Sequence, residues 1–245
     1  MFSFVECGGF FSGRTFLTWL REKLAVKGIG ADDTFQMFHQ KTGADLSVVA
    51  SDTTDVELLV LNHRTAPDLP VANAVRMSMS IPFVWQEVRW QPLWGTYLGR
   101  PKAGNTIVDG GVLSNFPIRL VATTDDEIAA IMGNTDPAGA LNLGLLIDER
   151  LSVAGAPAQD ATPVPLTHLR SVQRVSRLID TMMGAYDTEM IRRFDQEICR
   201  LPAKGYGTLE FGLSGQRLDL FLEAARGAMR RHLQARTDLA KAAVP

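Results

Sequence analysis

The sequence predicts an α/β fold in which helices cover a sheet. Short runs of β-branched and aliphatic residues alternate with segments of helical spacing over the first 150 residues, and helical segments follow. Such an alternation is typical of layered α/β domains. Hydrophobic residues make up 46% and charged residues 21% of the 245 residues, which is ordinary for a globular chain long enough to bury a core.

Three helices are expected in the first 82 residues. The segments "RTFLTWLREKLAVKG" (14–28) and "TFQMFHQKTG" (34–43) place apolar residues three and four apart, and each closes on a glycine. The segment "LPVANAVRMSMSIP" (69–82) has the same spacing and is stopped by Pro82. These segments would supply the helical layers of the domain.

Five runs have the composition of strands. "LSVVASD" (46–52) and "VELLVLN" (56–62) are separated by three residues, so they are expected to be neighbouring strands with a tight connection. "WGTYLGR" (94–100) and "NTIVDGG" (105–111) are two more short candidates. "ALNLGLLID" (140–148) is continuously apolar, which predicts a strand buried on both faces.

The last third of the chain is expected to be helical. Residues 151–166 are rich in Ala, Pro and Gly and are interpreted as a surface connection. Apolar stripes at helical spacing follow over 172–190 and 218–233. The predicted organisation is therefore a domain over residues 1–150, followed by a connection and C-terminal helices over 151–245 that pack on it.

Charge and cysteine usage argue against several classes of protein. The net charge of −2 and the pI near 6.1 give no reason to expect nucleic acid as a partner. Cys7 and Cys199 are far apart and are interpreted as reduced thiols of a cytoplasmic protein. The four histidines have no HxxxH or HExxH spacing, so neither a metal nor another cofactor is expected. No signal peptide or apolar run of about 20 residues is present, which predicts a soluble chain.

The stretch "NTIVDGGVLSNFP" (105–117) contains the strongest candidate for a catalytic residue, Asp109. Asp-Gly after an apolar run is a common turn signal, because Asp and Gly both tolerate left-handed backbone conformations. The alternative is a carboxylate held at a strand end, where it accepts a proton from a hydroxyl group. The stretch alone favours the turn and leaves both interpretations open.

Serine nucleophiles are harder to find. "GLSGQ" (212–216) lacks the final glycine of G-x-S-x-G and is interpreted as a helix N-terminus capped by Ser214. Ser78 and Ser80 fall in a predicted helix, whereas a nucleophile elbow needs its serine on a strained strand-to-helix turn. No serine of this sequence therefore has the context of a nucleophile.

Four segments in order resemble the patatin-like phospholipase family of acylhydrolases. They are "GGFFSGRTFLTWLREKL", "LSVVASDTTDVELLVLN", "AVRMSMSIPFVW" and "IVDGGVLSNFPI". The resemblance spans roughly residues 8–148. The resemblance implies a three-layer α/β/α domain that hydrolyses acyl esters of phospholipids or related lipids, with peripheral membrane contact and without a cofactor.

The resemblance also implies a Ser-Asp dyad. The family has a serine in G-x-S-x-G, a glycine-rich oxyanion loop, and an aspartate in an Asp-Gly-Gly (DGG) motif. Asp109 matches that aspartate and would accept the serine proton without a histidine between them. Gly110 and Gly111 would let the loop approach the serine closely.

This sequence contains no G-x-S-x-G, and the family's N-terminal part is expected to be missing. Three interpretations stay open. The sequence is the C-terminal portion of a lipid hydrolase, or it is a catalytically inactive lipid-binding or regulatory module, or another chain supplies the missing half. Lipid preference, regiochemistry and oligomeric state have no signal in the sequence.

Overall fold

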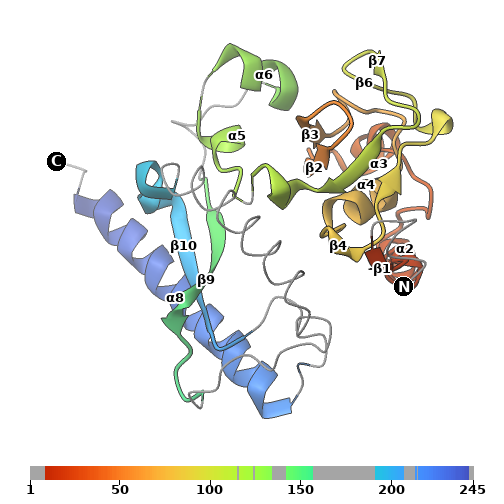
Figure 1. Cartoon of the computed structure of the whole chain (residues 1–245). Helices are drawn as coiled ribbons and strands as arrows, with labels where there is room; N and C mark the ends of the chain where they lie inside the picture. Colours follow the sequence, from red (N-terminus) through yellow and green to blue (C-terminus); the bar gives the residue numbers. More distant parts are fainter. Residues whose placement is uncertain are drawn as a thin grey trace. The chain divides into compact units, whose positions relative to one another are not determined.

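The computed structural model describes residues 9–114, 116–123, 125–133, 142–156, 191–206, 213 and 215–242 (Figure 1). The described residues belong to two compact units, one before residue 139 and one after it. Helices and strands alternate along the first unit, and a long helix lies at the C-terminus. The predicted α/β class is confirmed.

The first unit is built on a four-stranded sheet with the order β3-β2-β8-β5. Its strands are β2 (Val48–Asp52), β3 (Glu57–Leu61), β5 (Val88–Arg89) and β8 (Thr106–Asp109). All neighbours in this sheet are antiparallel. The expected neighbouring pair over 46–62 is thus a β-hairpin.

The three predicted helices are present as α2 (Arg14–Val26), α3 (Phe35–Thr42) and α4 (Val71–Ser78). Thr34 caps α3 by accepting a hydrogen bond from the backbone N–H of Met37, and Gly43 ends the helix with φ of 67°. Helix α4 packs on β2 and β8. The resulting core contains Phe35, Ala50, Leu59, Leu61, Ala66, Leu69, Val71, Ala74, Met77, Trp90, Trp94, Tyr97 and Ile107.

Smaller elements complete the first unit. The expected strand over 94–100 is a short hairpin of β6 (Thr96–Tyr97) and β7 (Arg100–Pro101), preceded by the 3₁₀ turn η1 (Pro92–Trp94). Strand β1 (Gly9–Phe11) pairs in parallel with β4 (Phe83–Trp85). The short helices are α5 (Arg119–Ala122) and α6 (Asp126–Met132).

Arg76, a buried residue of α4, links the strand pair β1–β4 to the rest of the first unit through hydrogen bonds. The guanidinium group of Arg76 donates to the backbone carbonyl oxygens of Ser12, at 3.0 Å, and Gln86, at 2.7 Å. It also donates to the hydroxyl of Ser80. Burial lowers the pKa of Arg76, and these bonds satisfy the charge where water is excluded.

The second unit holds a two-stranded parallel sheet of β9 (Gly144–Ser152) and β10 (Ile198–Lys204). The 3₁₀ turn η4 (Asp195–Glu197) precedes β10, and helix α8 (Gly215–Ala242) packs on β10. Strand β9, which the sequence analysis grouped with residues 1–150, therefore pairs within the second unit.

Two expectations for this region were wrong. Strand β9 is not buried on both faces, since the side chains of Leu145 and Ile147 are 52% and 63% exposed while Asp148 is buried. An apolar run is found in half-exposed strands as well as in buried ones, so the run alone does not show whether both faces of the strand are buried. The region after residue 166 is also not entirely helical, because β10 lies within it.

Other expectations fall partly or wholly outside the described residues. The apolar stripe over 172–190 and the cap at Ser214 lie outside them. The C-terminal helix over 218–233 is confirmed within α8. Among the described helices, none is long and apolar enough to cross a membrane.

Candidate active site

Asp109 is the last residue of β8, at the point where the sheet ends. Its neighbours in the strand, Ile107 and Val108, are fully buried, and Ala50 of β2 lies opposite Asp109 in the antiparallel register. The backbone N–H of Asp109 donates to the carbonyl oxygen of Ser80 at 3.1 Å, just beyond the end of α4. The carboxylate is thus held by a rigid strand and by the segment that follows a helix.

The turn after Asp109 is the 3₁₀ turn η2 (Gly110–Val112), and Asp109 is its N-cap. The Oδ1 atom of Asp109 accepts a hydrogen bond of 2.7 Å from the backbone N–H of Gly111. Within the described part of the chain the Asp109 carboxylate accepts this one hydrogen bond, and its Oδ2 atom has no hydrogen-bond partner among the described residues. The residue is therefore a turn former that keeps one oxygen available.

Gly110 allows the turn to lie directly against strand β2. A Cβ atom at this position would be 2.6 Å from the carbonyl oxygen of Val49, which is a backbone atom and cannot move aside easily. The hydroxyl of Ser51 approaches the carbonyl oxygen of Gly110 from the same strand, at 3.4 Å. Close packing of η2 on β2 fixes the position of the Asp109 carboxylate.

We expect Gly110→Ala to lower the free energy of unfolding by about 1–3 kcal/mol, because the added methyl group overpacks this contact. Urea denaturation measures the change. Gly227→Ala is a matched control, since Gly227 lies inside helix α8 with room for a methyl group, and it should stabilise the protein. A neutral Gly110→Ala would mean that η2 can separate from β2 at little cost.

A pocket of about 460 Å³ opens beside Asp109. Its lining combines an apolar wall with hydroxyl groups: Ser47, Val48, Val49, Val75, Ser78, Met79, Asp109, Gly110, Gly111, Ser114 and Pro117. Burial raises the pKa of Asp109, and the hydrogen bond from Gly111 offsets part of this rise. A carboxylate with a raised pKa next to an apolar pocket has the properties of a general base.

Ser78 and Ser80 lie near this pocket without forming a nucleophile elbow. Ser78 is the last residue of α4 and lines the pocket. Ser80 was expected inside this helix, but it lies beyond the helix end. Its buried hydroxyl is hydrogen-bonded to Arg76. None of the residues that line the pocket is a histidine.

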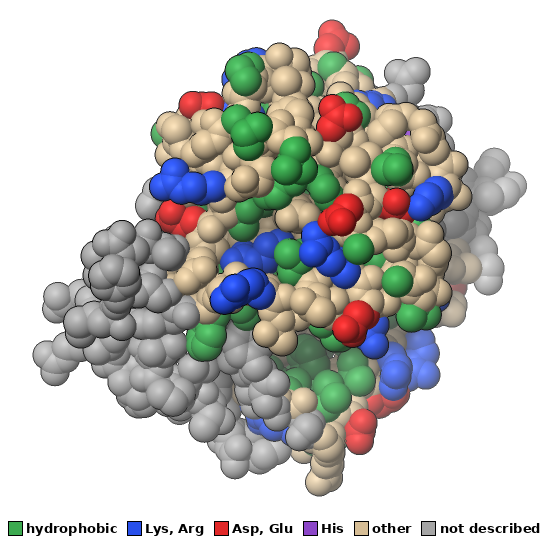
Figure 2. All heavy atoms as spheres, turned by 90° about the vertical axis from the view of Figure 1, so that its right-hand side faces the viewer, with side chains coloured by type: hydrophobic (Ala, Val, Ile, Leu, Met, Phe, Trp, Pro, Cys, Tyr) green, Lys and Arg blue, Asp and Glu red, His purple; other side chains and the backbone are tan. Residues whose placement is uncertain are grey.

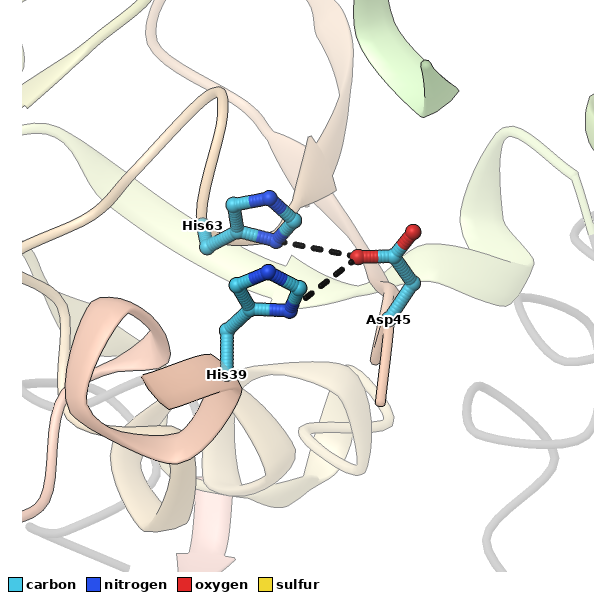
Figure 3. A group of neighbouring side chains, drawn as sticks. All are labelled: His39, Asp45 and His63. Atoms are coloured by element: carbon cyan, nitrogen blue, oxygen red, sulfur yellow. Dashed lines mark ion pairs between the residues drawn. The ribbon is translucent and has the colours of Figure 1, made fainter. Parts of the chain in front are cut away.

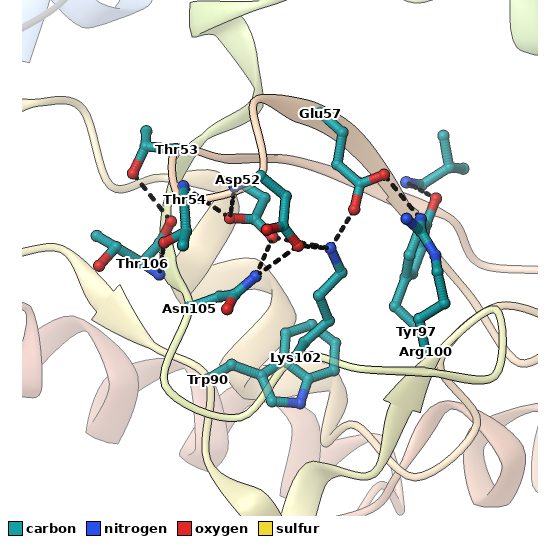
Figure 4. Close-up of polar contacts among 12 residues, drawn as sticks. Asp52, Thr53, Thr54, Glu57, Trp90, Tyr97, Arg100, Lys102, Asn105 and Thr106 are labelled. Carbon is teal, nitrogen blue, oxygen red and sulfur yellow. Dashed lines mark hydrogen bonds and ion pairs between the residues drawn. The ribbon is translucent and has the colours of Figure 1, made fainter.

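The fold also brings together two polar clusters that the sequence analysis missed. In the first, His39, Asp45 and His63 converge from separate elements (Figure 3). In the second, Lys102 lies among Asp52, Asp55 and Glu57 (Figure 4). Neither has a local sequence signal, because each contains one residue that is distant in the chain from its partners: His63 in the first and Lys102 in the second.

The second cluster is an ion-pair network that already contains its cation. The side chain of Lys102 is 1% exposed, and its ammonium group lies 3.0 Å from Asp52 Oδ2 and 2.5 Å from Asp55 Oδ2. It also contacts Glu57. Burial alone would lower the pKa of Lys102, but the hydrogen bonds to these carboxylates outweigh it and the pKa is raised. The cluster supports the hairpin of β2 and β3 and does not lie in the pocket.

Charged side chains of both signs are interspersed with hydrophobic ones on the face of the described residues in Figure 2. On that face neither the positive nor the negative side chains form a continuous charged patch. This distribution agrees with the small net charge of the chain.

Residues 2–122 match the family model described as patatin-like phospholipase. This part of the chain belongs to the patatin-like phospholipase family. The matched region contains β8, the turn η2 and every residue that lines the pocket. The resemblance inferred from the four sequence segments is confirmed.

Two curated proteins are similar to this patatin-like chain. "Uncharacterized protein YqhO" of Bacillus subtilis (strain 168) is 29% identical over 226 residues, which cover 89% of this chain and 65% of that protein. "Probable lipid hydrolase 463L" of Invertebrate iridescent virus 6 is 29% identical over 111 residues, which cover 45% of this chain and 34% of the viral protein. The chain thus spans less than two thirds of the length of each of these relatives.

Proposed function

We propose that this chain carries the aspartate half of a lipid acyl hydrolase site, with Asp109 as the general base of a Ser-Asp dyad. The observation on which the proposal rests is the Asp109 carboxylate beside the pocket, with Oδ1 used by its own turn and Oδ2 left without a described partner. The family match and the name of the viral relative support lipid hydrolysis as the reaction class.

The proposed reaction is acyl transfer to a serine followed by hydrolysis. Asp109 takes the proton from a serine hydroxyl while the serine oxygen attacks the carbonyl carbon of the lipid ester. The proton then passes to the departing alcohol as the ester bond breaks, which leaves an acyl-enzyme. Water hydrolyses that acyl-enzyme in the second half, with Asp109 again accepting a proton. The raised pKa of Asp109 makes it a better base than an exposed aspartate.

The pocket fits the acyl part of such a substrate. Val48, Val49, Val75 and Met79 provide apolar surface for a chain of methylene groups. Ser47 and Ser114 place hydroxyl groups on the same lining, where the more polar end of an ester would lie. The substrate class is a phospholipid or another acyl-ester lipid, reached by peripheral contact with a membrane or micelle.

The serine of the dyad is not among these 245 residues, since no G-x-S-x-G occurs in them. We therefore expect a fluorophosphonate probe, which labels activated serines, to leave the 245-residue chain unlabelled. We expect it to label the product of the complete reading frame that contains these residues. The readout is covalent labelling followed by mass spectrometry of the labelled peptide.

Two results would change this proposal. Labelling of the 245-residue chain itself, lost in Asp109→Asn, would place the nucleophile within this sequence. Absence of labelling in the complete product, together with retained binding to phosphatidylcholine vesicles, would favour the alternative of a non-catalytic lipid-binding module.

A further inference from the structure

His39, Asp45 and His63 form a compact cluster on three different elements of the first unit (Figure 3). His39 lies in the last turn of α3, Asp45 lies in the segment between α3 and β2, and His63 lies in the turn after β3. Both imidazole rings present Nδ1 to the same carboxylate atom, Asp45 Oδ1, and both distances are 3.3 Å.

These distances match the spacing of ligands around a tetrahedral metal ion. Imidazole nitrogen and carboxylate oxygen bind Zn²⁺ at about 2.0–2.1 Å, so two ligands in a tetrahedral arrangement lie ~3.3 Å apart. All three ligand atoms of the cluster lie within 4.8 Å of one another. A ligand set of two imidazoles and one carboxylate suits first-row transition-metal ions better than it suits Mg²⁺ or Ca²⁺.

The Asp45 carboxylate forms an ion pair with Arg64 through the oxygen that does not face the histidines. The guanidinium group of Arg64 donates to Asp45 Oδ2 at 3.1 Å, which leaves Oδ1 facing the two histidines. Metal-binding carboxylates are commonly fixed by such a second hydrogen bond. The carbonyl oxygen of Ala44 lies 3.2 Å from Nδ1 of His39, so a further oxygen atom lies next to the cluster.

We propose that His39, Asp45 and His63 bind a single first-row transition-metal ion, with Zn²⁺ as the representative cation. The ligands are Nδ1 of each histidine and Oδ1 of Asp45, and solvent or the Ala44 carbonyl oxygen completes the coordination. The site is separate from the Asp109 pocket, and its test does not depend on lipid hydrolysis.

Metal binding requires the two rings to turn. The imidazoles are stacked with centroids 3.9 Å apart and an interplanar angle of 5°, so their Nδ1 lone pairs lie in nearly parallel planes and do not yet meet at one point. The χ2 torsion of histidine has a broad energy profile, so the rings can tilt toward a shared ion at small cost. The His39 side chain is 35% exposed and the Asp45 side chain 49% exposed, which gives room for the movement and a route for the ion.

The position of the site gives it a structural role. An ion held by these three residues links the end of α3 to the start of β2 and the end of β3. Ser47 and Val48, which follow Asp45 closely, line the pocket beside Asp109. The amide of Asn62, next to His63, donates to the hydroxyl of Ser47 at 3.1 Å. The bound ion would therefore make one wall of the pocket more rigid.

The test is a Zn²⁺ titration of the untagged 245-residue chain by isothermal calorimetry, with thermal unfolding as a second readout. We expect one equivalent of Zn²⁺ to bind and to raise the melting temperature. His39→Asn and His63→Asn should each weaken the affinity at least about tenfold, a loss no smaller than that caused by removing an outer-shell partner. His232→Asn is the matched control, because it removes an imidazole of the second unit and should leave the affinity unchanged.

The outcomes are distinguishable even if one variant folds poorly. His39 is partly exposed on a helix, so His39→Asn should keep the circular dichroism spectrum of the metal-free parent. The proposal is overturned if the parent binds no Zn²⁺ at millimolar concentration. It is also overturned if His39→Asn binds as tightly as the parent, or if His232→Asn weakens binding as much as His63→Asn does.

Discussion

Replacing Lys102 by methionine is expected to lower the free energy of unfolding by about 3–5 kcal/mol. The side chain of Asp52 has no solvent exposure, and Lys102 is its ion-pair partner at 3.0 Å. Methionine keeps most of the length of the lysine side chain but leaves the Asp52 carboxylate buried with Asn105 as its remaining side-chain donor, at 2.7 Å. An uncompensated buried charge is among the most destabilising changes that a single substitution can produce.

Urea denaturation at neutral pH measures this loss, and two variants test its cause. Arg100→Ala breaks a more exposed ion pair with Glu57, at 2.7 Å, and should lower the free energy of unfolding far less than Lys102→Met does. Adding Asp52→Asn to Lys102→Met removes the stranded charge and should recover part of the stability. A loss under about 1 kcal/mol for Lys102→Met would contradict the view that the network of Figure 4 supports the sheet.

Asp109→Asn is expected to separate activity from stability. In a protein that also supplies the dyad serine, loss of the proposed general base should lower turnover of an acyl ester by about 10²–10⁴-fold. The same change should raise the free energy of unfolding of this chain at neutral pH by about 0.5–2 kcal/mol, because it removes a charge whose burial raises the pKa of Asp109. Asparagine retains the oxygen that accepts from Gly111, so the turn is kept.

The pH dependence of this gain follows from the raised pKa of Asp109 in the folded state. As the pH rises above the ordinary value of 3.8, the unfolded chain releases the proton before the folded chain does. The ionised aspartate therefore costs stability, and this cost grows from that pH upward until the folded-state pKa is passed, above which it stays constant. The gain from Asp109→Asn should be present at pH 7 and disappear as the pH falls toward 3.8.

Asp109→Ala is the control for the turn. Alanine also removes the buried charge, but it cannot accept the hydrogen bond from Gly111, and loss of such a cap costs about 1 kcal/mol. Asp109→Ala should therefore be less stable than Asp109→Asn at every pH. Thermal unfolding of both variants between pH 4 and 7 makes the comparison. An Asp109→Asn variant that is less stable than the parent at pH 7 would mean that the carboxylate has a stabilising partner.

Local patterns were enough to predict the longer helices and strands of the first unit, whereas the short elements β1, β4, β5, α5 and α6 were not predicted. The helices α2, α3 and α4 and the hairpin of β2 and β3 were predicted because spacing, capping residues and β-rich composition are properties of neighbouring residues. Strand β9 was located, but its burial was wrong, since burial depends on what packs against a strand and not on its own sequence. Strand β10 was missed in a region that was interpreted as helical.

The candidate site was predictable only in part. The sequence singled out Asp109 and its glycines, because an apolar run followed by Asp-Gly-Gly is a local pattern. Two features of the site could be seen only in the structure. Oδ1 of Asp109 accepts a hydrogen bond from Gly111 while Oδ2 has no described partner, and Gly110 lies in close contact with Val49. The pocket is lined from β2, α4 and η2, which are distant in sequence, so no local pattern indicates it.

What the sequence determined by itself is the α/β class, the helices α2, α3 and α4, the strands β2, β3 and β8, the family, and Asp109 as the candidate base. Each of these depends on residues within a few positions of one another or on motifs in a fixed order. The tertiary structure alone decided which side chains meet: Asp109 with its pocket, Lys102 with its three carboxylates, and His39 with Asp45 and His63. These contacts depend on strand register and helix packing. Both bring together residues from different parts of the chain, and no local sequence pattern links such residues.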